Sequence, residues 1–211
     1  MSLEKTKNFK QVNHSVTKVD AKQLALGKPS YVADFVPRDA LIVKMLWSPH
    51  PHARIVSMDV SAAEKMPGVK AVLRHGNVPR IPHTTAGQGF PEPSPYDTFM
   101  FDTKVRFVGD RVAFVAAETE AIAEKALQLI DVEYEELPAI LDAREAMKPG
   151  ASVIHDEPEY VNFADSDPAH NKAAAIRIDI GDVEQGFIEA DRIYEQEYEV
   201  PKVQQAHIEP H

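Results

Sequence analysis

Between residues 105 and 135 the sequence changes from the strand period to the helix period and back again. Residues 111–117 are almost entirely apolar, which is typical of a buried strand. Residues 119–130 carry apolar side chains at helical spacing on one face, and Thr119 is a good N-cap for that helix. Residues 131–135 alternate by two again. This order predicts an α+β fold in which a helix covers one face of a sheet.

A hairpin is expected at the start of this unit. Residues 105–108, apolar except for Arg106, come directly before the strand at 111–117. Gly109 and Asp110 separate them, and a two-residue Asp/Asn/Gly loop between apolar runs is a strong hairpin signal. The sequence therefore predicts that these two segments pair with each other.

Three more strands are expected earlier in the chain, at 39–47, 54–60 and 69–74. Between the second and the third, Ser61 and Glu64 have the spacing of a capping box, which predicts a short helix that ends before Pro67-Gly68.

The stretch from about 75 to 102 is rich in glycine and proline, so we expect a loop. A loop of this length is unusual in a compact domain and favours an interaction surface, with its tip at 83–96 in contact with other domains or subunits. It also carries large apolar residues that need a partner or a fold-back onto the domain, namely Phe90, Tyr96, Phe99, Met100 and Phe101. The alternative is that Phe99 and Phe101 begin the next strand and pack in the core.

The outer parts of the chain show weaker patterns. Residues 1–20 are polar and indicate an arm, and residues 141–180 are rich in Pro and Asp and indicate an extended linker that wraps a surface. Asp182 and Gln185 predict a capped helix to Glu189. The alternation from Ile193 onward predicts a strand without partners, whose open edge would pair with the domain, with a second copy or with another domain.

Charge and cysteine content exclude several classes of function. The chain has 23 Lys+Arg against 33 Asp+Glu, a net charge of −10, so nucleic acid and anionic membranes are not expected partners. It has no cysteine, which excludes disulfides, thiolate metal sites and cysteine nucleophiles. Its first residues lack the apolar core of a signal peptide and no stretch is long enough to span a bilayer, so we expect a cytoplasmic protein.

The residues alone predict neither a catalytic set nor a metal site. His50 and His52 flank a proline and are expected to be structural or solvated. His207, Glu209 and His211 could lie on one face of an extended segment, but Pro210 excludes the helical spacing of metalloprotease sites, which favours a structural or interface role. We found no complete dinucleotide-binding glycine motif and no nucleophile elbow.

Three stretches together resemble one enzyme family. The first stretch is made of residues 27–34, 41–55 and 66–72. The second combines residues 108–116 with residues 132–138. The third extends from Gly181 to the Glu-Pro-His sequence at 209–211. They resemble the start of the molybdenum-binding subunit of the xanthine dehydrogenase and aldehyde oxidase family. The resemblance implies an α/β hammerhead domain at 21–140, an extended linker at 141–180 and, at 181–211, the first elements of an incomplete molybdopterin-binding domain.

The resemblance also implies what the chain does. It would be the N-terminal portion of a molybdenum hydroxylase that oxidises a purine, an N-heterocycle or an aldehyde, inactive alone because the molybdopterin-holding loops and the activating glutamate lie in residues that the chain lacks. Its partners would be the remaining molybdenum-binding domains and the iron–sulfur and FAD subunits, with a homo-oligomer as a further possibility. Gln204 or Gln205 would approach the molybdopterin–molybdenum cofactor in the assembled enzyme, and no cofactor is expected on this chain alone. A non-catalytic docking domain for redox subunits is the alternative.

Overall fold

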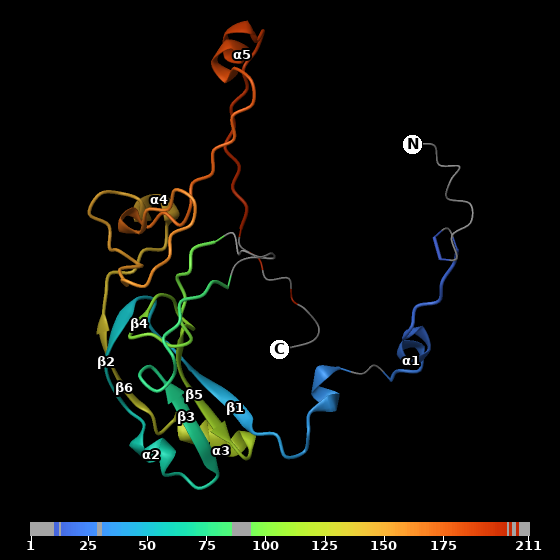
Figure 1. Cartoon of the computed structure of the whole chain (residues 1–211), viewed down its shortest axis with the longest axis vertical. Coiled ribbons are helices and arrows are strands. Elements are labelled where there is room, and N and C mark those ends of the chain that lie inside the picture. The colour runs from blue at the N-terminus through green and yellow to red at the C-terminus, as the bar shows by residue number, and fades with distance from the viewer. Residues whose placement is uncertain are drawn as a thin grey trace. The chain divides into compact units, whose positions relative to one another are not determined.

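The structure, a computed structural model, describes residues 11–12, 14–28, 31–85, 94–201, 203 and 206. It divides into two units, the larger formed by residues 39–196 and the smaller by residues 1–38 and 197–211. The smaller unit contains the helix α1 (Ala21–Ala25) and the 3-10 helix η2 (Val32–Phe35). All other elements belong to the larger unit (Figure 1).

The larger unit is built on two three-stranded antiparallel sheets. One has the order β1-β5-β3, formed by β1 (Ile42–Trp47), β5 (Arg111–Ala117) and β3 (Val69–Arg74). The other has the order β4-β2-β6, formed by β4 (Lys104–Val105), β2 (Ala53–Asp59) and β6 (Asp131–Glu136). The strands predicted at 39–47, 54–60, 69–74, 111–117 and 131–135 are therefore confirmed.

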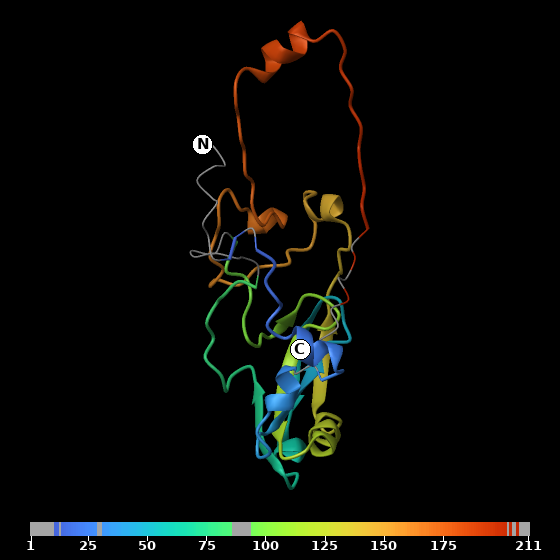
Figure 2. The same cartoon turned by 90° about the vertical axis from the view of Figure 1, so that its right-hand side faces the viewer.

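The helices α2 (Ser61–Glu64) and α3 (Glu120–Leu127) lie at the same end of the sheets (Figure 2). Thr119 caps α3 as predicted, because its hydroxyl accepts a hydrogen bond from the Ile122 amide at 3.3 Å. The alanines of α3 let it approach β5 closely. The resulting core consists of Val60, Ala63, Val72, Val115, Ala117, Ala123 and Ala126.

The predicted hairpin between 105–108 and 111–117 is wrong. β4 pairs with β2, whereas β5 lies in the other sheet between β1 and β3. Residues 106–110 instead form a turn between the sheets, in which Gly109 has a φ of +91° and the Asp110 carboxylate accepts the amides of Arg106 and Arg111 at 2.9 and 2.8 Å. The turn pairs with Ser48 through two backbone hydrogen bonds of 2.8 Å. The Gly-Asp signal thus marks a tight turn, but Ser48 takes the place of the expected partner strand.

The predicted capping box is also wrong. α2 begins at Ser61 itself, its N-cap is Val60, and no side chain caps it. The Asp59 carboxylate, two residues upstream, accepts the hydrogen bond from the Ser61 amide at 2.9 Å. Because Ser61 already lies inside the helix, its hydroxyl is not in the N-cap position that a capping box requires.

The loop at 75–102 is described except for residues 86–93, so Phe90 lies outside the described residues. The described parts are irregular apart from the isolated bridges His83–Thr98 and Tyr96–Val161. Phe99 and Phe101 are buried; the guanidinium of Arg80 lies 3.7 Å from the Phe99 ring centroid, and Phe101 packs edge-on against Phe114. Of the two alternatives for Phe99 and Phe101, the structure supports the one in which they pack in the core. Their packing on the domain is confirmed, although neither belongs to a strand.

After β6 the chain forms α4 (Ala143–Ala146) and the 3-10 helix η3 (Pro168–His170). Asn171 ties this region together, because its side chain donates to the carbonyls of Ala146 and Ser152 and accepts the amide of Ile154. The boundaries of the linker at 141–180 stay a prediction.

The helix α5 (Val183–Glu189) is capped as predicted, with the Asp182 carboxylate accepting the Gln185 amide at 2.9 Å. The strand predicted from Ile193 onward is wrong for the described residues, because 192–200 belong to no strand. The alternating sequence is there, but no described strand runs beside it to complete a ladder.

Candidate functional site

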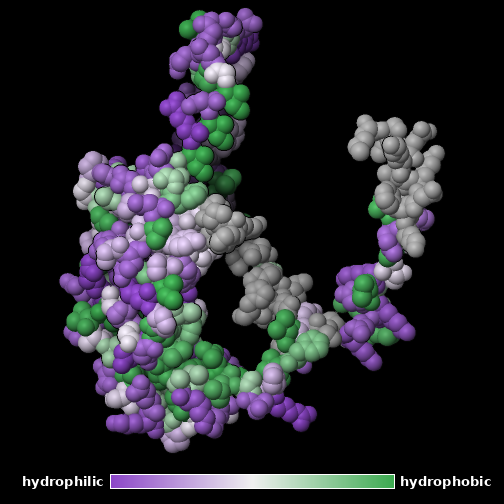
Figure 3. All heavy atoms as spheres, viewed as in Figure 1, coloured by the Kyte–Doolittle hydropathy of each residue, from purple (hydrophilic) through white to green (hydrophobic). Residues whose placement is uncertain are grey.

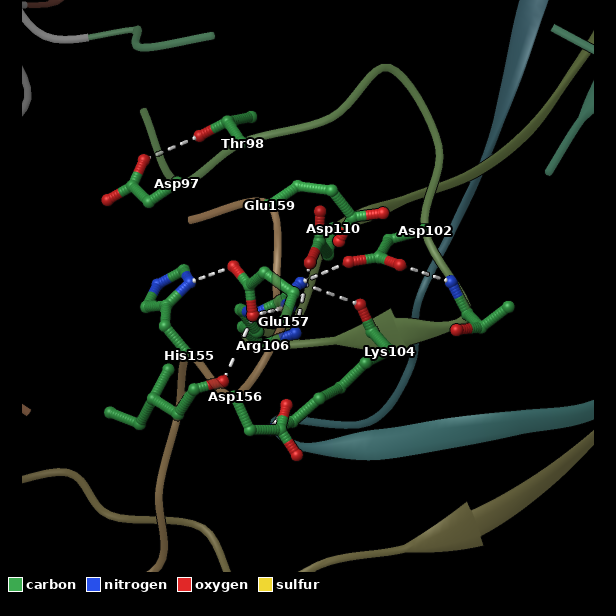
Figure 4. A network of polar contacts seen from close by, with 12 residues as sticks. Asp97, Thr98, Asp102, Lys104, Arg106, Asp110, His155, Asp156, Glu157 and Glu159 are labelled. Atoms are coloured by element: carbon green, nitrogen blue, oxygen red, sulfur yellow. Dashed lines mark hydrogen bonds and ion pairs between the residues drawn. The ribbon is translucent and has the colours of Figure 1, made fainter. Parts of the chain in front are cut away.

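The most concentrated polar chemistry in the described residues is a network of ion pairs beside β4 (Figure 4). Three of its members, Asp102, Lys104 and Arg106, are buried or nearly so and lie within or next to β4. The partners of Lys104 and Arg106 come from residues 153–159, about fifty positions later in the chain. We call this set, completed by Arg54, Arg80, His155, Asp156, Glu157 and Glu159, the ion clamp.

Arg106 is the centre of the ion clamp. Its guanidinium donates to the carboxylates of Asp102 at 2.9 Å and Glu157 at 2.8 Å. It also donates to the carbonyls of Lys104 and Ile154 at 3.1 and 3.2 Å. One buried cation therefore joins the strand end, the loop and the segment after α4, with carboxylates and carbonyls as acceptors.

Three further cations extend the ion clamp on either side. Lys104 donates to Asp156 at 2.9 Å and to the Val153 carbonyl at 3.0 Å, and Arg54 of β2 holds the other Asp156 oxygen at 2.9 Å. Arg80 donates to Asp102 at 2.7 Å and to Glu159 at 2.9 Å. The ion clamp thus fastens residues 153–159 against β2, β4 and the loop.

These contacts hold the carboxylates ionised. Burial raises the pKa of Glu157, but hydrogen bonding from His155 and the charge of Arg106 outweigh it and lower that pKa to about 2. Burial also raises the pKa of Asp156, but the hydrogen bonds from Lys104 and Arg54 outweigh this effect and lower that pKa to about 2. The pKa of Asp102 is lowered by Arg80 and Arg106 against its burial.

We expect the ion clamp to make the fold sensitive to acid. A carboxylate whose pKa is lower in the folded state stabilises the protein above its unfolded pKa, and this stability is lost as the pH falls towards the folded value. For Asp156 and Glu157 that window runs from their ordinary values of 3.8 and 4.5 down to about 2. The melting temperature should therefore fall through this window, and Glu157→Gln should flatten the fall while lowering the melting temperature at pH 7. An unchanged slope in the variant would contradict the assignment.

The ion clamp is suited to holding the structure together. Its buried cations are each paired with carboxylates, which leaves none of them poised to bind an anion or to move a proton. Within the described ranges, no group of three or more His, Asp or Glu side chains could hold a metal ion. Beside the ion clamp lies a cavity of about 440 Å³ whose lining includes Trp47, Phe99, Phe107 and Arg111.

Residues 26–138 match the family model described as "Aldehyde oxidase and xanthine dehydrogenase, a/b hammerhead domain". This is more than half of the 211-residue chain. The chain belongs to this family. The family resemblance and the α+β hammerhead fold expected from the sequence are thereby confirmed.

Named relatives and solved structures agree with this assignment. The protein named "Probable hypoxanthine oxidase XdhD" from Escherichia coli K12 is 45% identical over 92% of this chain and 23% of its own length. The "Nicotinate dehydrogenase large molybdopterin subunit" of Eubacterium barkeri is 30% identical over 97% of this chain and 44% of its own. Quinoline 2-oxidoreductase from Pseudomonas putida 86 superposes with a TM-score of 0.53 and 36% identity, over 66% of this chain and 18% of that one. Aldehyde oxidoreductase from Desulfovibrio desulfuricans superposes with a TM-score of 0.56 and 32% identity, over 70% of this chain and 17% of that one.

The ion clamp of this hammerhead protein does not fit molybdopterin. A phosphate-bearing cofactor needs free cations or backbone donors, and the cations of the ion clamp are already held by carboxylates at 2.7–2.9 Å. The candidate cofactor residues Gln204 and Gln205 lie outside the described residues, as do His207, Glu209 and His211. Their part in cofactor binding stays a prediction.

The histidine pair at 50 and 52 has structural partners in the hammerhead. His52 is buried and its Nδ1 lies 2.8 Å from the Pro138 carbonyl. Burial lowers its pKa, which keeps the imidazole neutral at pH 7. His50 lies 3.6 Å from the Glu136 carboxylate and packs against the Tyr134 ring. The expectation of a structural role for these two residues is confirmed.

The ion clamp was not expected from the sequence. Two signals for it were present: Arg106 interrupts the apolar run at 105–108, and residues 155–159 read His-Asp-Glu-Pro-Glu within a stretch assigned as a linker. Buried cations require acidic partners, and this acidic run could have been matched to them.

Among the described helices none is long and apolar enough to cross a bilayer.

Proposed function

We propose that this chain supplies the hammerhead-bearing part of a molybdenum hydroxylase subunit. The enzyme would oxidise a purine, an N-heterocycle or an aldehyde, with water as the source of the oxygen. The observation that carries the proposal is the family match over residues 26–138, together with relatives named as hypoxanthine and nicotinate enzymes. The molybdopterin–molybdenum cofactor, the iron–sulfur and FAD subunits and a cytoplasmic location belong to the same proposal.

The domain organisation is proposed in the same terms. A polar arm at 1–20 precedes the hammerhead at 21–140; an extended linker at 141–180 leads to the first elements of the molybdopterin-binding domain at 181–211. Supporting this, α5 has only seven residues, and a helix of that length is marginal without tertiary packing. Exposed apolar side chains flank it on both sides, at Ile176, Ile178, Ile180, Tyr194 and Val200. Such a segment gains stability by packing in a larger domain, where Gln204 or Gln205 would approach the cofactor.

A chimera tests the proposal directly. We replace the segment of Escherichia coli XdhD that matches this chain with this chain, and measure molybdenum content and dye-linked oxidation of hypoxanthine, other N-heterocycles and aldehydes. We expect the purified chimera to contain molybdenum and to turn over at least one of these substrates. The isolated chain should do neither, because a cofactor site needs donors that converge from a closed pocket.

XdhD without the matching segment is the control and should be inactive. Stoichiometric molybdenum and turnover in the isolated chain would contradict the expected dependence on the remaining domains. A chimera that assembles with redox subunits but contains no molybdenum would favour the non-catalytic docking domain instead.

A further inference from the structure

One face of the β1-β5-β3 sheet is apolar and, within the described residues, partly exposed, with Phe101 of the loop packed against Phe114. Lys44 of β1 forms ion pairs with Glu120 and Glu124 of α3, so its side of the sheet faces the helices. Side chains alternate along a strand, which places Val43 on the opposite side. The strand register brings Val43 beside Ala116, and it brings Met45 beside Phe114, with Leu73 of β3 on the other side of Phe114.

Loop residues complete this surface. A groove of about 380 Å³ is bounded by Leu73 and Phe114 from the sheet and by Ile81 and Met100 from the loop, and its lining is almost wholly carbon. We define the apolar face by its exposed members and the groove floor: Val43, Trp47, Leu73, Ile81, Met100 and Phe114. Figure 3 shows apolar side chains gathered over the part of the molecule formed by β1, β3 and β5.

A surface of this kind calls for a partner. Single exposed apolar residues are normal, whereas a contiguous apolar patch with a concave centre marks an interaction site. None of the six residues that define the apolar face is charged, so the partner must be recognised by shape and apolar burial.

The remaining polypeptide of the subunit fits this surface better than a second copy does. In the relative that matches 92% of this chain, the matching segment makes up only 23% of the length, so a much longer polypeptide accompanies that segment in the relative. Two copies of this chain would each carry a net charge of −10 and would repel each other.

We propose that the apolar face is the docking surface for the remaining part of the molybdenum-binding subunit. The element that docks presents aliphatic or aromatic side chains, one or two of which enter the groove between the sheet and the loop. The inference rests on the proposed function, because it assigns a place on the hammerhead to the partner that this function requires.

Binding of a partner to the apolar face can be measured through Trp47. It is the single tryptophan of the chain, it belongs to the apolar face, and about half of its surface is exposed. The full chain labelled with 5-fluorotryptophan therefore gives one ¹⁹F signal. The probe is the unlabelled part of Escherichia coli XdhD that lies outside its match to this chain. On titration with the probe we expect a shift of the signal and loss of its response to a soluble paramagnetic quencher.

Two valines form a matched pair of variants. Val43 on the apolar face is 55% exposed, and Val56 on β2 in the other sheet is 58% exposed. Val43→Asp should weaken binding by about tenfold or more, since it places a charge in an apolar interface, while Val56→Asp should bind like the unaltered chain. Ile81→Asp repeats the test from the loop, in case Val43→Asp does not fold as judged by circular dichroism.

The outcomes separate the two proposals. If the unaltered chain does not bind the probe, the proposed function fails and the inference fails with it. If it binds but the Trp47 signal and the affinity of Val43→Asp and Ile81→Asp are unchanged, the proposed function stands and the docking surface is wrong. A Trp47 signal that shifts with the concentration of the chain alone would show that a second copy covers the face, which also overturns the inference.

Discussion

Replacing Arg106 by alanine should lower the free energy of unfolding of the full chain by about 3 kcal/mol, at the low end of the range for breaking a buried ion pair. The side chain of Arg106 is 11% exposed, and its removal takes a donor from both Asp102 and Glu157. Each carboxylate keeps another side-chain partner, Arg80 for Asp102 and His155 for Glu157, which limits the loss. Urea denaturation followed by far-ultraviolet circular dichroism measures the change.

Arg177 is the matched control. It is an arginine of the same chain that forms an ion pair with Asp179, but its side chain is 86% exposed. Arg177→Ala should change the unfolding free energy by less than about 1 kcal/mol, because exposed ion pairs contribute little. Equal effects for the two variants would show that the ion clamp does not hold residues 153–159 to the sheet.

Phe101→Ala should cost about 3–5 kcal/mol, the range for removing a large aromatic side chain from a core. Phe101 is 2% exposed and packs against Phe114 with ring centroids 4.8 Å apart and ring planes at 78°. This edge-to-face contact anchors the long loop to the central strand β5. The thermal unfolding midpoint of the full chain should fall by about 6–20 °C, on the order of 2–4 °C for each kcal/mol in a unit as large as residues 39–196.

The adjacent Met100 is the control for this variant. It lies in the same loop but is 44% exposed, so Met100→Ala should change stability by about 1 kcal/mol or less. If Phe101→Ala were as mild as Met100→Ala, the loop would be a surface excursion throughout, as its composition first indicated.

The elements that the sequence predicted correctly are those whose signal is local. β5 and α3 follow from an apolar run and from a helical stripe behind Thr119, and α5 follows from the Asp182 cap. The errors arose where the hydrogen-bond partner of a correctly recognised local feature lies far away in the sequence. Gly109-Asp110 is a real turn, but Ser48, some sixty residues away, supplies the hydrogen bonds that a partner strand would have made. No local pattern contains that information.

The candidate site was harder to predict for the same reason. Arg106 and Glu157 lie fifty-one positions apart, and nothing in either neighbourhood specifies the other. Charged residues in a Pro-rich stretch are usually solvated, so the sequence alone favours a linker over an ion clamp. The apolar face was equally hidden, because Val43 and Leu73 become neighbours of β5 only through the strand register.

The strand order also has a consequence for how the chain folds. Each sheet takes strands from both halves of the hammerhead: β1 pairs with β5, and β2 pairs with β6. The β1-β5-β3 sheet is complete only when residue 117 has been synthesised, and the β4-β2-β6 sheet only when residue 136 has been synthesised. The early strands therefore emerge from the ribosome without neighbours. Pairing between strands so far apart in sequence is slow, because a long loop must close before any contact is gained. The nascent hammerhead therefore exposes unpaired strands until the later strands emerge.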